Sequence, residues 1–213
     1  STVNNVSLVY GRDGQGPSDS DYINALDEFK DPEVVDVSFI LNSAGGATRA
    51  LHAIDNIAEF RKDCIVCISP ERADVVNNSS YVGKEVVDTI AFRNTLRSTS
   101  YAVMDSGFKY QYDKYNDVFR YVPLNGDTAG LMVRTDNTRD PWYSPAGYNR
   151  GIMKNVVKLS FNPNKTQRDE LYKNGINPVI TQAGQGTLLF GDKTLLDKPS
   201  AFDRINVRRL FIV

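Results

Sequence analysis

A nearly continuous apolar run at 34–41 (VVDVSFIL) is the feature that most constrains the fold of this chain. It lacks the strict polar alternation of a strand with one wet face, so it is typical of a strand in a sheet covered on both faces. Helical patterns flank it. One begins at Ser18, with Asp21 three residues on, and carries an apolar stripe to Phe29, and another extends from about Ala47 to Lys62. The sequence therefore predicts a sheet covered by helices.

The rest of the first half continues this alternation of strands and helices. Further strands are predicted at Asn5–Tyr10, Cys64–Ser69 and Tyr101–Met104, and a further helix from about Gly83 to Arg97. Such alternation implies right-handed crossovers and a mostly parallel sheet with helices on both faces. We therefore expect an α/β part at about 1–105.

The second half, at about 106–213, changes to antiparallel hairpins, which makes the fold class mixed α/β. One hairpin joins Phe108–Tyr112 to Val118–Val122, and another joins Val179–Gln182 to Thr187–Phe190. The remaining predicted elements are a helix near Asp127–Thr135, a loop at 141–147, a strand at Asn155–Phe161, a helix from Asn162-Pro163 through Leu171, and a terminal helix or strand at Asp203–Val213.

The charges of the chain are balanced overall but not along its length. Its 213 residues include 25 Lys and Arg against 26 Asp and Glu, a balance that disfavours a protein built to wrap nucleic-acid phosphates. Residues 1–100 carry nine basic and fifteen acidic side chains, whereas residues 101–213 carry sixteen and eleven. Such a chain can present surfaces of opposite sign for head-to-tail self-association or for a charged partner. Scattered solvated charges are the alternative.

Membrane insertion is not expected from this sequence. It contains no run of about 18 apolar residues, the length that a transmembrane helix needs. The polar start at 1–5 (STVNN) is unlike a secretory signal peptide. The chain begins without Met and stops at an apolar segment, 210–213 (LFIV), which leads us to expect a piece of a longer protein.

Cys64 and Cys67 form a C-x-x-C motif, which is compatible with a thioredoxin-like or a zinc site. They lie in a short β-branched apolar run, however, and in a strand a spacing of three points two side chains to opposite faces. No second Cys pair and no His follow at zinc spacing. We predict buried structural thiols and no metal site.

Two other features suggest enzymatic chemistry, and both have simpler interpretations. The segment 42–47 (NSAGGA) follows a strand and precedes a helix, as a phosphate-binding loop does, but it lacks the G-x-G-x-x-G and P-loop spacings. His52 is the only histidine, with Asp55 as a possible partner, and Ser43 is the nearest nucleophile, yet no G-x-S-x-G motif surrounds any serine. We favour a tight turn and a solvated helix histidine. An α/β nucleotide-binding or hydrolase domain is the rival class.

Acidic pairs and an aromatic hairpin complete the candidates. The acidic pairs are Asp113 with Asp117 and Asp136 with Asp140, which lack the ligand spacing of a calcium loop and are predicted to be solvated turn residues. Four aromatic side chains lie on the first hairpin: Tyr110, Tyr112, Phe119 and Tyr121. They could form a platform for single-stranded nucleic acid, but cross-strand pairing is the commoner cause of such a pattern. We therefore predict no catalytic residues, no cofactor and no bound nucleic acid.

Three blocks of the second half carry a family resemblance. The blocks are 129–136 (AGLMVRTD) followed by 141–147 (PWYSPAG), then 176–178 (INP) with the hairpin at Gly184 and Gly186 and 189–195 (LFGDKTL), and finally 202–210 (FDRINVRRL). In order and spacing they resemble the tail sheath protein of contractile-tailed bacteriophages, most closely that of the T-even-like myoviruses. The first hundred residues match less distinctively, although an α/β core is what the family requires.

The resemblance implies a sheath core whose outer domains and C-terminal arm are absent from this chain. Its implied function is structural and not enzymatic: subunits form hexameric rings that stack helically around the tail tube, and contraction drives the tube through the host envelope for genome delivery. Implied partners are other copies, the tail tube protein, the baseplate and the tail terminator. The implied location is the virion, after assembly in the host cytoplasm. A related contractile injection system, such as a tailocin, is the alternative.

Two interface expectations follow from the charge pattern and the resemblance. Basic residues of the second half would face the tail tube or an acidic neighbour, in particular Lys154, Lys158, Arg204, Arg208 and Arg209. The loop at 142–147, which includes the candidate interface residue Trp142, would be a rigid, proline-fixed element that holds the core near a subunit contact. The alternative, internal packing of the Trp142 side chain, is slightly favoured.

Overall fold

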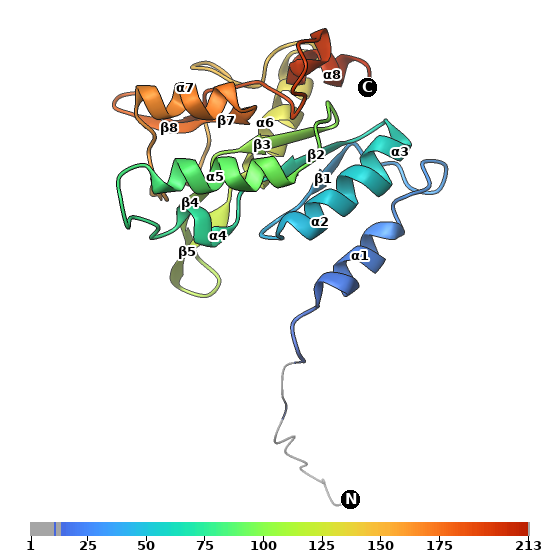
Figure 1. Cartoon of the computed structure of the whole chain (residues 1–213), viewed down its shortest axis with the longest axis horizontal. Helices are drawn as coiled ribbons and strands as arrows, with labels where there is room; N and C mark the ends of the chain where they lie inside the picture. The colour runs from blue at the N-terminus through green and yellow to red at the C-terminus, as the bar shows by residue number, and fades with distance from the viewer. Residues whose placement is uncertain (1–10, 12–13, 213) are drawn as a thin grey trace, which may run out of the picture.

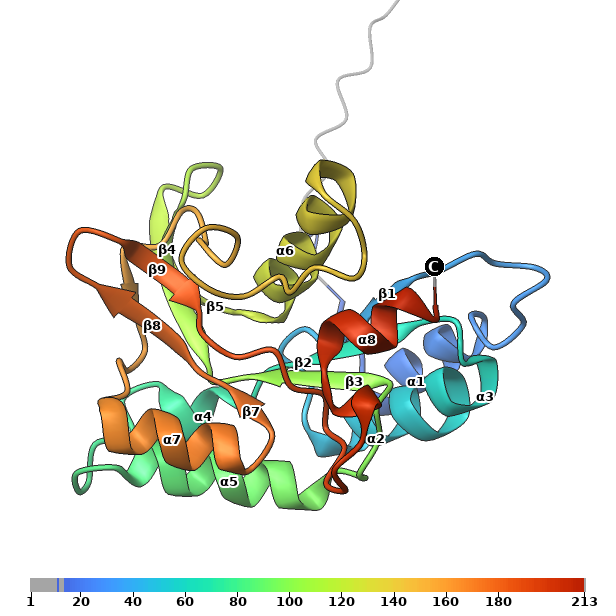
Figure 2. The same ribbon diagram turned by 90° about the horizontal axis from the view of Figure 1, so that it is seen from above.

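A four-stranded parallel sheet lies at the centre of the molecule, with helices on both of its faces (Figures 1 and 2). Figure 1 presents a computed structural model of the chain, which describes residue 11 and residues 14–212. The strand predicted at Asn5–Tyr10 lies outside the described residues. The predicted mixed α/β class is confirmed.

The first half alternates helices and strands as its sequence predicts. Its elements are α1 (Asp19–Asp27), β1 (Phe39–Leu41), α2 (Ala47–His52), the π-helical η1 (Ala53–Ala58), α3 (Glu59–Arg61), β2 (Ile65–Ile68), α4 (Arg72–Val75), α5 (Lys84–Thr95) and β3 (Ala102–Asp105). The capping box of Ser18 and Asp21 starts α1 as expected. α2, η1 and α3 follow one another without a break, so the long predicted helix is confirmed with a π-helical middle.

The second half contributes two antiparallel units, three α-helices, a short 3-10 helix and one more strand of the central sheet. Its elements are β4 (Phe108–Asp113), β5 (Val118–Pro123), α6 (Asn125–Thr138), β6 (Lys158–Leu159), α7 (Lys165–Lys173), β7 (Ile176–Asn177), β8 (Val179–Gln182), β9 (Gly186–Leu189), the 3-10 helix η2 (Ala201–Asp203) and α8 (Ile205–Leu210). Both predicted hairpins are confirmed, as β4–β5 and β8–β9.

Three boundaries of the second half differ from the prediction. α6 is longer at both ends than Asp127–Thr135. α7 starts after Asn164, whose side chain accepts a hydrogen bond from the backbone N–H of Gln167, so the cap lies beyond Asn162-Pro163. The predicted strand 155–161 shrinks to β6, because only two of its residues pair with β4. The terminal segment forms a helix and not a strand.

β1 is shorter than the apolar run that predicted it. It is an edge strand that pairs only with β2, from Phe39 opposite Ile65 to Leu41 opposite Cys67. Because β2 begins at Ile65, a strand that started at Val34 would have no partner over its first residues. Val34 is instead 74% exposed. The apolar run therefore marks the strand correctly but overestimates its length.

The strand order is β1-β2-β3-β7, and all three pairings are parallel. β7, which the sequence did not predict, joins the sheet where Ile176 lies opposite Met104 and Asn177 lies opposite Asp105. The second half of the chain therefore completes the sheet that the first half begins.

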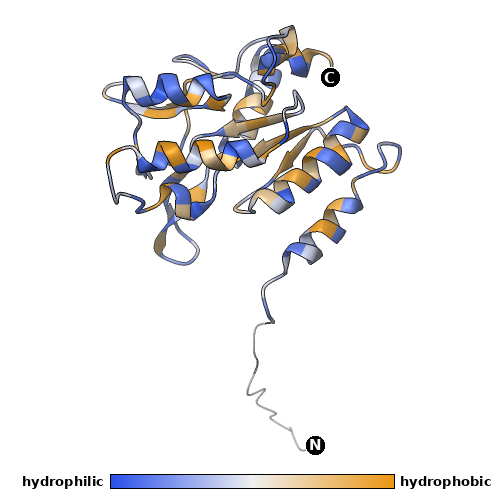
Figure 3. Ribbon diagram, viewed as in Figure 1, coloured by the Kyte–Doolittle hydropathy of each residue, from blue (hydrophilic) through white to orange (hydrophobic). Residues whose placement is uncertain are grey.

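Each face of this sheet has its own set of helices (Figure 2). On the first face, α2, η1, α5 and α7 pack on alternate strand residues such as Val66 and Met104. On the second face, α6 and α8 pack on Cys67 and Val103. The central strands are accordingly largely hydrophobic in Figure 3. The two cysteines point to opposite faces as predicted, and both are free and buried.

Asp105, at the carboxyl end of β3, is a buried carboxyl group. It is 1% exposed. It accepts hydrogen bonds from the Ser69 hydroxyl at 2.7 Å and from the Gly107 N–H at 2.9 Å. Burial outweighs these two bonds and raises the pKa of Asp105 from 3.8 to about 8.

Ionisation of Asp105 should make the chain less stable as the pH rises. The folded state keeps the proton up to about pH 8, whereas the unfolded chain releases it near its ordinary pKa of 3.8. Between these values the free energy of unfolding should fall by up to about 1.4 kcal/mol per pH unit from this group. Asp105→Asn removes the titration, so denaturant unfolding across this range should show a flatter pH dependence for the variant. Equal slopes would contradict the assignment.

Candidate functional site

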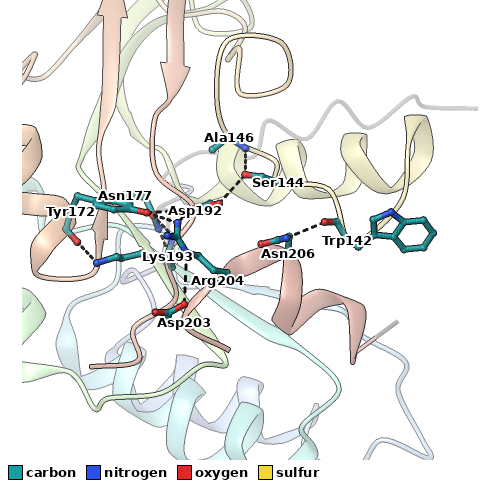
Figure 4. A network of polar contacts seen from close by, with 10 residues as sticks. All are labelled: Trp142, Ser144, Ala146, Tyr172, Asn177, Asp192, Lys193, Asp203, Arg204 and Asn206. Atoms are coloured by element: carbon teal, nitrogen blue, oxygen red, sulfur yellow. Dashed lines mark hydrogen bonds and ion pairs between the residues drawn. The ribbon is translucent and has the colours of Figure 1, made fainter. Parts of the chain in front are cut away.

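Asp192, in the segment after β9, is the centre of a surface polar network (Figure 4). Its carboxylate accepts hydrogen bonds from Arg204 Nη1 at 2.5 Å, from the Ser144 hydroxyl at 3.2 Å and from the Tyr172 hydroxyl at 3.3 Å. The bond to Asp192 raises the pKa of Arg204, whose side chain remains 45% exposed. Arg204 is therefore a positive charge held in one place at the surface.

Asn177 of β7 ties this network to the central sheet. Its side chain accepts from the Lys193 N–H at 2.7 Å and donates to the backbone oxygens of Lys193 at 2.8 Å and Met104 at 3.1 Å. Gly191 permits this approach, because a Cβ there would lie 2.7 Å from Asn177 Oδ1. The segment that carries Asp192 is thus held in two ways, by Asn177 of β7 and by the partners of the Asp192 carboxylate.

Arg208 and Arg209 lie inside the molecule, whereas the sequence predicted them at a basic surface. Arg208 donates to the Tyr101 hydroxyl at 3.2 Å, and its guanidinium carbon lies 4.2 Å and 4.1 Å from the ring centres of Tyr101 and Phe202. This stacking is a favourable place for a guanidinium. Both arginines are buried because α8 packs its inner side on the sheet and on α6.

Arg209 forms the deepest charged contact of α8. It is 1% exposed, donates to the Met132 carbonyl at 3.1 Å and forms an ion pair with Asp136 of α6. Burial lowers the pKa of Arg209 to about 10. Asp136 was predicted to be a solvated turn residue, and it is instead the partner that allows a buried arginine.

The loop at 141–147 is anchored through its backbone while its tryptophan stays exposed. Asn206 Nδ2 of α8 donates to the Trp142 carbonyl at 3.0 Å, and Arg150 Nε donates to the Ser144 carbonyl at 2.6 Å. The Trp142 side chain points away from the network in Figure 4, and the residue is 51% exposed. Internal packing therefore does not account for Trp142.

Lys154 and Lys158 are exposed on the side of the antiparallel sheet. Lys158 lies on β6, and its ammonium sits 5.1 Å from the ring centre of Tyr110. The structure brings Trp142 and Arg204 together through α8 and Asp192, while the two lysines belong to a separate part of the surface.

The aromatic residues of the first hairpin form cross-strand pairs, as the sequence favoured. The ring centres of Tyr110 and Tyr121 are 4.8 Å apart, and those of Tyr112 and Phe119 are 5.1 Å apart. At the tip of this hairpin, Asp113 accepts bonds from Asn116 within the turn. These contacts explain the pattern by local sheet stability.

The carboxyl edge of the parallel sheet, where such folds bind ligands, is filled by the protein's own polar groups. The Ser69 hydroxyl, which donates to Asp105, accepts from the Asn125 N–H at 3.0 Å. The Asn125 side chain in turn donates to the Ser43 carbonyl at 2.7 Å. The sequence did not single out Asp105 or Asn125, although a polar residue at the end of an apolar strand is a recognisable signal.

Polar side chains of the protein also occupy the glycine turn before α2. Asn42 Nδ2 donates to the Gly45 carbonyl at 2.6 Å. A Cβ at Gly46 would lie 2.7 Å from Glu71 Oε1, so a carboxylate of the protein already stands at the start of α2. This favours the tight-turn interpretation over a phosphate-binding loop.

His52 has partners other than the one that the sequence proposed. Its Nε2 lies 2.6 Å from Asp27 Oδ1, and its Nδ1 lies 3.0 Å from Asn56 Nδ2. Asp55, the expected partner, instead pairs with Arg97 at 3.1 Å. His52 therefore links α1 to the long helix. Its side chain is 16% exposed, so the expectation of a solvated histidine is wrong.

Among the described residues, 11 and 14–212, there is no group of three or more His, Cys, Asp or Glu side chains placed to hold a metal ion. None of the helices in that part of the chain has the length and hydropathy needed to cross a membrane.

Comparisons with known proteins find one family. The family model of the phage tail sheath protein central domain matches residues 15–195. A tail sheath protein of Enterobacteria phage T4 is 46% identical over 90% of this chain and 31% of the relative. One of Vibrio phage KVP40 is 43% identical over 94% of this chain and 32% of the relative. The chain thus spans about a third of the length of these relatives.

Solved structures share the fold at low identity. The sheath tail protein of Listeria innocua has a TM-score of 0.61 at 10% identity, covering 93% of this chain and 40% of that one. A chain of the anti-feeding prophage baseplate has a TM-score of 0.61 at 17% identity, covering 84% and 44%. At these identities the likeness concerns the fold.

Arg209→Met should destabilise the chain, because it leaves Asp136 without its partner under α8. We expect a loss of roughly 3 kcal/mol in the free energy of unfolding, at the lower end for a broken buried pair since Asp136 is partly exposed. Arg139→Met, at the exposed end of α6, is the control and should cost under about 0.5 kcal/mol. Similar losses in both variants, measured by denaturant unfolding, would refute the structural role of Arg209.

Proposed function

The chain belongs to the phage tail sheath protein family, and we propose that it is part of a structural subunit of a contractile phage tail. In this role, subunits form hexameric rings that stack helically around the tail tube. Contraction of the sheath drives the tube through the host envelope and allows genome delivery. The observation that carries the proposal is the 46% identity with the tail sheath protein of phage T4 over 90% of the chain.

A phage sheath is favoured over the sheath of a related injection system such as a tailocin. The relatives between 42% and 46% identity are phage proteins, from KVP40, T4 and ViI. The anti-feeding prophage and the extracellular contractile injection system match at 21% identity or less, which supports a common fold.

The proposed role is mechanical and not enzymatic. The filled carboxyl edge and the occupied glycine turn support this, because the two places where an α/β domain would bind a substrate hold Ser69, Asn125 and Glu71 of the chain itself. A mechanical role needs a rigid body whose contacts with its neighbours have two stable arrangements. The fixed segments around Asp192 and Asn177 fit such a body.

The partners of this role are other copies, the tail tube protein, the baseplate and the tail terminator. The subunit would be located in the virion after assembly in the host cytoplasm, with neither nucleic acid nor membrane as a direct partner. The opposite charges of the two halves of the chain support contacts between copies.

The interface residues of this proposal are Trp142, Arg204, Lys154 and Lys158. Tryptophan and arginine are enriched among the residues that contribute most to protein interfaces. Trp142 and Arg204 are half exposed. Hydrogen bonds hold the backbone of Trp142 and the guanidinium of Arg204, so little freedom would be lost on binding. Arg208 and Arg209 contribute to this interface indirectly, because their hydrogen bonds to Tyr101 and Met132 hold α8 in place.

A chimaera tests the proposed function. In it, this chain replaces the matching part of the tail sheath protein of phage T4. We expect tubes or stacked rings in negative-stain electron microscopy, as for the unmodified T4 protein. A chimaera that is folded by circular dichroism but stays monomeric at all salt concentrations would contradict the proposal.

Trp142→Ala in the same chimaera should impair assembly and leave thermal stability nearly unchanged, because the indole is half exposed. Tyr115→Ala, at the 87% exposed hairpin tip, is the control and should assemble normally. Polymer yield by sedimentation and the melting temperature separate the two effects. Loss of stability with normal assembly would mean that Trp142 supports the fold only.

Charge reversal tests whether Lys154 and Lys158 belong to the interface. Lys154→Glu with Lys158→Glu should weaken assembly and alter its salt dependence, because exposed charges interact through a screened field. Assembly with unchanged yield at every salt concentration would remove these residues from the interface.

A further inference from the structure

A cavity of about 460 Å³ lies between α5, α7 and the segment at 193–203. Three basic side chains line it, namely Arg93, Lys173 and Lys193, together with the acidic Asp197 and Asp203. The net charge of these five side chains is therefore +1. Two of these residues, Lys193 and Asp203, also belong to the polar network around Asp192 (Figure 4).

Arg93, on α5, has a hydrogen-bond donor without a partner inside this wall. The residue is 4% exposed, and its Nη2 donates to the Leu195 carbonyl at 2.9 Å and to Asp197 Oδ1 at 2.5 Å. Its Nε is buried and has no hydrogen-bond partner among the described residues. Asp197 is 64% exposed, so it offsets the charge of the buried guanidinium only in part. An acceptor placed at Nε would recover the cost of the unmade bond.

Gly175 lies beside this donor in the wall of the cavity. Its φ of +78° favours glycine, and a Cβ there would lie 3.7 Å from Arg93 Nε. Lys193 is held at the same wall, because its ammonium donates to the Tyr172 carbonyl at 3.0 Å and lies 4.4 Å from the Tyr172 ring centre. An ammonium has three donors, so further donors of Lys193 remain for a ligand.

We propose that this cavity is an oxyanion site, in which Arg93 Nε, Lys173 and Lys193 bind a carboxylate or phosphate group. Hydrogen bonds between cationic donors and such oxygens are the strong class of hydrogen bond. The group has two possible sources, an acidic side chain of a second copy or free phosphate. The first source rests on the proposed function, and the second does not.

A candidate for the first source lies in the acidic half of the chain. Residues 28–36, between α1 and β1, expose Glu28, Asp31, Glu33 and Asp36. This segment can supply an exposed carboxylate, and its charge is complementary to that of the cavity.

Calorimetric titration of the 213-residue chain tests the site with two probes, inorganic phosphate and a synthetic peptide of residues 28–36. Lys173→Gln changes an exposed residue of the wall and should weaken binding about fivefold, as expected for the loss of one partly solvated charge contact. Lys165→Gln, at the other end of α7 and outside the cavity, is the matched control and should leave binding unchanged.

Binding of the peptide, with competition from phosphate, would assign the site to a second copy. Binding of phosphate alone would assign it to the free ion. The proposal is overturned if neither probe binds, or if Lys173→Gln and Lys165→Gln affect binding equally. Because the readout is binding to a single chain, its failure would leave sheath assembly untouched, and a chimaera that does not polymerise would leave this test valid.

Discussion

β2 and β3 are buried along their whole length, and this burial governs the rest of the molecule. A strand buried on both faces needs two layers of cover. The first layer comes mainly from nearby helices, α2, η1 and α5, whereas the second comes from α6 and α8, which follow much later in the chain. The need for this second layer explains why α8 buries Arg208 and Arg209 while Arg204, at its start, stays at the surface.

The polar groups of the core cross-link its elements through hydrogen bonds. Ser69, Asp105 and Asn125 close the carboxyl edge of the sheet, and Asn177 fixes the segment of Asp192. These contacts join elements that are distant in sequence, and the bond from Asn125 to Ser69 ties the second half of the chain to the first. What remains for function is the outer surface, where the exposed aromatic and basic side chains are held on fixed backbone.

The sequence predicted the elements that carry their own start and stop signals, such as the capped helix at Ser18 and the hairpins. It misjudged β1 and missed β7, because strand length is set by the partner strand and a pair such as Ile176–Asn177 has no periodicity. It slightly favoured internal packing of Trp142, which is half exposed, and it placed the buried Arg209 at the surface. Burial of an arginine depends on a tertiary partner, here Asp136, which local patterns do not reveal.

The origin of β7 also determines when the core can close during synthesis on the ribosome. β3 gains its second neighbour only after Ile176–Asn177 has been made, and the second face is covered only after α8 has followed. Pairing between distant segments has to wait for the intervening chain. A bare sheet edge and an uncovered apolar face are thus displayed until these later segments have been made, so we expect the hazard of aggregation to fall on the nascent chain and not on the finished fold.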